Sequence, residues 1–107
     1  MGVFTEIKDN QWQRRVDGGY EMCWAVYMRE WDMGSGCFAI TGSFSISDYP
    51  QDEVEWAKEN HHLGPDATDD KVAAALFENC GADFDVEVFD THDEALAYVR
   101  GWMAGRE

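Results

Sequence analysis

A hairpin-turn signal followed by a long run of alternating side chains most limits what this chain can fold into. The tripeptide Asp17-Gly18-Gly19 is a strong turn signal, and the residues from Tyr20 to Trp31 alternate in character after it. Two sets of side chains would take opposite faces: Tyr20, Met22, Trp24, Val26 and Met28 on one, and Glu21, Cys23, Ala25, Tyr27 and Arg29 on the other. A period of two residues indicates a β-strand, so this part of the chain is expected to form a hairpin.

Further strand patterns fill the rest of the first half. Val3 to Lys8 and Trp12 to Val16 are short candidates, and Cys37 to Ser47 alternates again after the glycine-rich turn Met33-Gly34-Ser35-Gly36. Gly42 interrupts the last of these strands and marks a bulge or a close approach of another group. Together these segments predict an antiparallel meander with one face on a core.

The second half is dominated by helix signals. Asp48 can cap a helix that has Pro50 in its first turn and ends near Leu63, and Thr68 can cap a second helix that ends at Gly81. Asp83 to Phe89 alternates strictly and predicts a strand with acids facing outward. Thr91-His92-Asp93-Glu94 is a capping box that opens a last helix.

The order of the elements indicates an α+β fold. We expect a mostly antiparallel β-sheet of four to five strands, with about three helices packed on one of its faces. The strand at Asp83–Phe89 lies between two helices, so the pattern leaves open whether it pairs in parallel or closes an edge. With 107 residues, of which 45% are hydrophobic, residues 1–107 are expected to form a single acidic domain.

The formal charge of −14 is concentrated in the second half of the chain. Residues 1–45 carry six acids and four bases, a net of −2, whereas residues 46–107 carry sixteen acids and four bases, a net of −12. Such a chain repels nucleic acid and anionic membranes, and it attracts basic partners. Arg14 and Arg15 are too few for a nucleic-acid site and are expected to pair with acids of this chain or of a second copy.

Part of the acidity has a local explanation, because Asp69, Asp70, Asp93 and Glu94 suit the starts of helices. Eight other acids and one tryptophan form the candidate partner-binding surface: Asp52, Glu53, Glu55, Trp56, Glu59, Asp83, Asp85, Glu87 and Asp90. Trp12, Trp31 and Trp56 have no obvious burial from the pattern; they either close the rim of a small core or contribute to an interface. Two other interpretations are a solvated face that keeps the protein soluble and an adaptation to high salt. The asymmetry between the two halves argues against salt adaptation.

In length, acidity, α+β organisation and lack of a catalytic signature, the chain resembles small acidic phage anti-defence proteins, the anti-CRISPR and antirestriction DNA mimics. The resemblance is one of general character and rests on no motif. It implies a non-enzymatic inhibitor whose acidic surface occupies a basic nucleic-acid-binding site on a partner protein.

Two alternatives stay open at this stage. The first is a regulatory domain that self-associates through its sheet and exposed aromatic residues, which would make it a homodimer. The second is a metal-binding domain that uses His61 and His62, although adjacent helical residues point about 100° apart.

No cofactor is expected. The three cysteines show no close pairing that would indicate a disulfide framework. Because no secretory signal or long apolar run is evident, we expect a cytoplasmic location.

Overall fold

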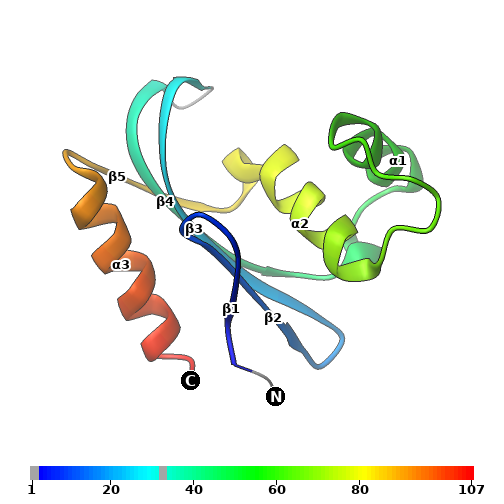
Figure 1. Cartoon of the computed structure of the whole chain (residues 1–107), viewed down its shortest axis with the longest axis horizontal. Coiled ribbons are helices and arrows are strands. Elements are labelled where there is room, and N and C mark those ends of the chain that lie inside the picture. Colours follow the sequence, from blue (N-terminus) through cyan, green and yellow to red (C-terminus); the bar gives the residue numbers. More distant parts are fainter. Residues whose placement is uncertain (1–2, 32–33) are drawn as a thin grey trace.

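The computed structural model describes residues 3–31 and 34–107, and within them one open antiparallel sheet of five strands is accompanied by three α-helices (Figure 1). The strands are β1 (Thr5–Lys8), β2 (Gln11–Val16), β3 (Gly19–Trp31), β4 (Gly34–Phe44) and β5 (Asp85–Phe89), and they lie in the order β1-β2-β3-β4-β5. The helices are α1 (Gln51–Asn60), α2 (Asp69–Asn79) and α3 (His92–Ala104), with the short 3-10 helices η1 (Ile46–Asp48) and η2 (Gly81–Asp83) between them. The predicted α+β fold is confirmed.

The sheet is built from hairpins in sequence order. Val16 pairs with Gly19 across the predicted turn, where Gly18 has a φ of 78° that a glycine adopts without strain. Met33, the first residue of the second predicted turn, lies outside the described residues. β5 pairs antiparallel with β4 at the edge of the sheet, which resolves the pairing that the pattern of alternating side chains left open.

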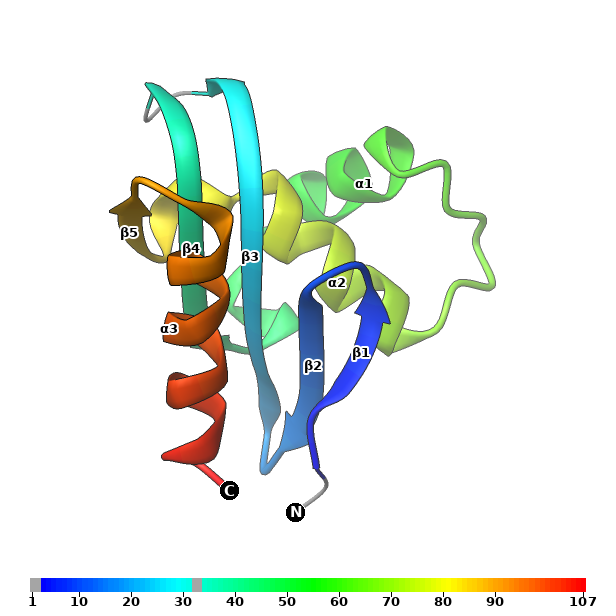
Figure 2. The same ribbon diagram turned by 60° about the vertical axis from the view of Figure 1, so that its left-hand side comes forward.

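The helices cover both faces of the sheet, so the expectation of helices on a single face is wrong. α1 and α2 pack on one face against Met22, Phe38 and Ile40, whereas α3 packs on the other (Figure 2). The face under α3 consists of small side chains from the central strands: Cys23, Ala25, Cys37 and Ala39. The small size of these side chains suggests a face open to solvent, but Ala95, Val99 and Met103 of α3 bury them.

Gly42 marks a close approach and not a bulge. Its pairing with Met22 continues the β3–β4 register without a shift. A Cβ at this position would lie 2.4 Å from Cδ1 of Phe84, which packs over the strand from the end of η2. Only a residue without a side chain leaves room for this ring.

The helix starts follow the predicted capping residues at two of three places. Thr68 caps α2, and Thr91 forms the expected capping box with Glu94. Asp48 instead belongs to η1, where its carboxylate accepts the backbone N–H of Ser45. The residue before the first turn of α1 is Pro50, so α1 begins two residues later than a helix capped by Asp48 would. α1 also ends before Leu63, because His62 has a φ of 55° that breaks the helix.

Candidate functional site

The outer side of α1 carries an exposed tryptophan among carboxylates. Val54 and Ala57 are buried against the rest of the protein. Since successive residues on a helix are about 100° apart, the opposite side presents four of the predicted residues to solvent. We call this surface the α1 acidic face: Asp52, Glu55, Trp56 and Glu59. Trp56 is 57% exposed, whereas Trp12 and Trp31 are partly buried at the edges of the core.

Cations do little to neutralise this face. Glu55 accepts a hydrogen bond from Gln51 at 2.8 Å and lies 3.8 Å from the ammonium of Lys58. Within the part of the chain that the structure describes, Asp52 and Glu59 have no ion pair. A shallow hollow of about 340 Å³ lies beside Trp56, lined by Pro50, Asp52 and Glu53 as well.

Glu53, at the start of α1, and Asp83, in η2, lie near Tyr49 and are not among the four residues of the α1 acidic face. Glu53 accepts a hydrogen bond from the thiol of Cys80 at 3.5 Å. Burial, followed by the nearby acidic groups Cys80, Asp83 and Glu53, raises the pKa of Tyr49 to about 12. Asp83 belongs to η2 and not to the strand predicted for it, so it is not in line with Asp85 and Glu87.

Asp85 and Glu87 lie on the opposite side of the molecule from α1. They pair with Thr41 and Ala39 of β4, and Ala39 faces the core under α3. Both are exposed on an edge strand, and Asp90 follows directly after it, exposed as well. Charges on an edge strand prevent pairing with another sheet, which gives these acids a local role. The predicted surface is therefore divided between two faces.

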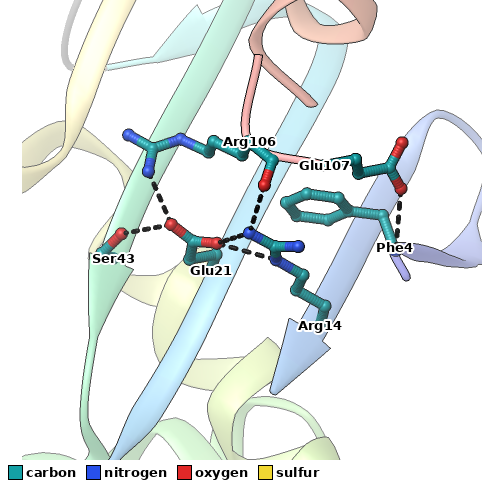
Figure 3. Close-up of polar contacts among 6 residues, drawn as sticks. All are labelled: Phe4, Arg14, Glu21, Ser43, Arg106 and Glu107. Carbon is teal, nitrogen blue, oxygen red and sulfur yellow. Dashed lines mark hydrogen bonds and ion pairs between the residues drawn. The ribbon is translucent and has the colours of Figure 1, made fainter. Parts of the chain in front are cut away.

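A buried charge cluster joins the end of α3 to three strands (Figure 3). Arg14 donates from Nε to Glu21 at 2.8 Å, and Arg106 donates to the other oxygen of that carboxylate at 2.6 Å. Arg14 also donates to the backbone carbonyl of Arg106 at 3.0 Å, and its guanidinium lies 4.7 Å from the centre of the Phe4 ring. Arg14 is only 8% exposed and Glu21 7%, so this pair is closed to a partner and has a structural role, whereas the Arg106 side chain is 40% exposed. Arg15 pairs with Asp70 at 2.8 Å, so both arginines bind acids of this chain, as expected.

The histidines and the cysteines are the other candidate residues that the sequence indicates. His61 follows the last residue of α1, and no group of three metal-ligating side chains comes together within residues 3–31 and 34–107. The three cysteines are buried, and burial raises the pKa of both Cys23 and Cys80 to about 12. These two thiols are therefore protonated and poorly nucleophilic at neutral pH.

A groove that the sequence patterns did not indicate lies between α2 and the β1–β2 hairpin. It encloses about 390 Å³ and is lined by polar and small apolar side chains: Ile7, Lys8, Gln11, Gln13, His61, Leu63, Asp70, Lys71, Ala74, Ala75 and Glu78. The sequence feature that corresponds to this groove is the alternation of the polar residues Gln11, Gln13 and Arg15 on β2. Polar residues at every second position normally face solvent, but here that side of the strand faces α2.

None of the helices in the described part of the chain is both long and apolar enough to span a bilayer. Comparisons with protein-family models, with curated proteins and with solved structures find no match for this chain.

Proposed function

We propose that this chain is a non-enzymatic binding protein that uses the α1 acidic face to occupy a basic surface on a partner protein. The observation that carries the proposal is Trp56, which is 57% exposed and is surrounded by carboxylates. Exposed tryptophan contributes strongly to binding at protein interfaces, and the surrounding charges steer an oppositely charged partner. Surfaces that bind nucleic acid are lined with lysine and arginine, so the partner site is one that otherwise holds a phosphate backbone.

Folding alone does not favour the charges on this face. Glu55 and Glu59 are four residues apart on one helix, where like charges repel each other. Glu59 also lies in the last turn of α1, where a negative charge opposes the helix dipole. Asp85 and Glu87 differ in this respect, because protection of the sheet edge accounts for them. The acids of the α1 acidic face therefore lack a local structural reason, whereas the acids of β5 have one, and this favours α1 as the binding surface.

The experiment compares two double variants that change the net charge equally. E55K/E59K reverses two charges of the α1 acidic face, and D85K/E87K reverses the β5 acids; each replaces two negative charges by two positive ones and changes the net charge from −14 to −10. We expect the wild-type protein and D85K/E87K to capture basic nucleic-acid-binding proteins from a cell lysate at about 50 mM KCl and to lose them at about 500 mM, where charges are screened within a few ångströms. E55K/E59K and Trp56→Ala should capture none of these proteins.

Duplex DNA supplies the second measurement, because a DNA-competitive partner is released when DNA is added to the captured complex. Retention of the same partners by E55K/E59K, or their loss in D85K/E87K alone, would show that α1 is not the binding surface. Partners that DNA does not displace would contradict the assignment to a nucleic-acid-binding site. Circular dichroism of each variant confirms that the fold is retained.

A further inference from the structure

The groove between α2 and the β1–β2 hairpin is a second site, separate from the α1 acidic face. One wall is α2, where Ala74 and Ala75 leave space because their side chains are small. The other wall is the sheet, where Gln11 and Gln13 take alternate positions on β2 and face α2. Leu63 from the α1–α2 connection and Ile7 from β1 complete an apolar lining. A volume of about 390 Å³ is at the lower end of the range for small-molecule pockets.

Gln11, one of the residues that line this groove, has a buried hydrogen-bond acceptor without a partner among the described residues. The residue is 0% exposed, and its Nε2 donates to Glu78 at 3.3 Å. Its Oε1 has no hydrogen-bond partner among the described residues. Turning the amide around would place the oxygen against the Glu78 carboxylate, so the orientation is fixed by that contact. A buried acceptor without a partner is unfavourable, and a ligand that brings an N–H donor would satisfy it.

The charged side chain at one end of the groove has an ion-pair partner, and the one at the other end has none among the described residues. At the Gln11 end, the carboxylate of Glu78 pairs with Lys8: Nζ and Oε2 lie 3.0 Å apart, and the Lys8 side chain is half-exposed. At the other end, the ammonium of Lys71 has no ion pair within the described residues. Lys71 and Glu78 are seven residues apart on α2, which places their backbones about 10 Å apart along the helix axis. A ligand would thus be bound best if it brought an N–H donor to the Gln11 end and an anion to the Lys71 end.

From this arrangement we infer that the groove binds a small, extended zwitterion of the amino-acid type. The ammonium of the ligand donates to Oε1 of Gln11 beside the Glu78 carboxylate, and its carboxylate pairs with Lys71. The apolar part of the ligand lies along Ala74, Ala75 and Leu63. The carboxylate of Glu78, which contacts the Gln11 amide, favours a ligand ammonium at this end even though Lys8 is close. This inference does not depend on the function proposed for the α1 acidic face.

The probe is 6-aminohexanoate, whose two charges stand at the ends of an extended chain, and hexylamine and hexanoate each keep only one of them. Titration into isotopically labelled protein, followed by NMR, reports directly on the side-chain amide of Gln11. We expect 6-aminohexanoate to shift that resonance to saturation and to bind at least about tenfold more tightly than either single-charge analogue, because each analogue loses one charge-assisted contact.

Two variants separate the two ends of the groove. Gln11→Leu fills the same space without the acceptor, and Lys71→Gln removes the cation; each should weaken binding at least about tenfold. Lys58→Gln is the matched control for the charge change, because Lys58 lies outside the groove and should leave binding unchanged. If Gln11→Leu does not fold, the comparison of Lys71→Gln with Lys58→Gln still decides the matter.

Three results would overturn the inference. A Gln11 resonance that stays in place at saturating probe would mean that water satisfies Oε1. Equal binding of hexylamine or hexanoate and the zwitterion would show that only one end of the groove is used. Binding that persists in both Gln11→Leu and Lys71→Gln would place the ligand elsewhere.

Discussion

At the residue scale, the polar side chains divide into those that hold the fold and those that face solvent. The Arg14–Glu21 pair is the clearest member of the first group, because both residues are less than a tenth exposed. The Arg15–Asp70 pair has a similar distance of 2.8 Å but belongs to the second group, with side chains 65% and 50% exposed. Equal geometry therefore does not imply equal energy, since water screens only the second pair.

Glu21→Leu should destabilise the protein by about 3–5 kcal/mol, because it leaves the buried guanidinium of Arg14 without its carboxylate. Arg15→Gln, the control, should lower the free energy of unfolding by about 1 kcal/mol or less. Urea unfolding of the two variants and the wild type measures both values. Similar small losses in both would mean that the Arg14–Glu21–Arg106 cluster does not hold α3 to the sheet.

The raised pKa values of two tyrosines determine how stability is expected to change at alkaline pH. Burial raises the pKa of Tyr49 to about 12, and burial followed by the hydrogen bond to Asp70 raises that of Tyr20 to about 12. Because the unfolded chain loses these protons near pH 10, their contribution is fully present below pH 10 and is lost as the pH rises from about 10 to 12.

The urea midpoint should accordingly fall between about pH 9.5 and pH 11.5. In Tyr49→Phe the fall should be smaller, because this variant has one fewer buried group to ionise. A midpoint that declines equally in the variant and the wild type would show that Tyr49 is not responsible. Absorbance of ionised tyrosine provides an independent reading of the same titration.

At the element scale, α3 is the only helix on its face of the sheet within the described residues, so the start of α3 affects a whole core. Thr91 accepts the backbone N–H of Glu94 at 3.2 Å, and the Glu94 carboxylate accepts the backbone N–H of Thr91 at 3.2 Å. Thr91→Ala should therefore cost about 1 kcal/mol of stability, whereas Thr91→Ser should cost little. Thermal unfolding followed by circular dichroism tests this, and equal melting temperatures for both variants would contradict it.

The elements themselves were largely predictable from local patterns. Period-two alternation identified β3 and β4, and the capping residues Thr68 and Thr91 identified the starts of α2 and α3. Which face each helix covers was not predictable, because Cys23, Ala25 and Ala39 are compatible with either an open or a covered surface. The distinction depends on contacts between strands of the first half and α3 at the end of the chain, which leave no local signal.

The candidate site was predictable only in part, for the same reason. The acids of α1 and the exposure of Trp56 follow from one helix and its period. The separation of Asp83 from Asp85 depends on a turn of 3-10 helix, and the groove depends on α2 lying across β2. Spacing along the chain does not report either arrangement.

At the scale of the whole molecule, the net charge of −14 repels itself in the folded state. We expect the urea midpoint to rise as KCl is increased from about 0.02 M and to level off near about 0.3 M, where the screening length is already shorter than most distances between surface charges. E55K/E59K, with a net charge of −10 (−14 plus 4), should show a smaller rise.

A midpoint that continues to rise into molar KCl would favour the interpretation of the acidity as an adaptation to high salt. A midpoint that does not change below about 0.3 M would show that repulsion among the acids has no measurable effect on folding. Sodium sulfate is unsuitable for this comparison, because it also strengthens hydrophobic burial.

The side chains on the two faces of the central strands differ in size, which makes a shifted strand register less stable than the native one. Large residues such as Met22, Phe38 and Ile40 fill one side, and small ones such as Cys23 and Ala39 fill the other. A slip of one residue between β3 and β4 would move the side chains of the slipped strand to the wrong side. Phenylalanine would then meet a space shaped for alanine, while the larger space would lie partly empty. Side-chain volume thus discriminates against the nearest wrong pairing, independently of the charges on the surface of the protein.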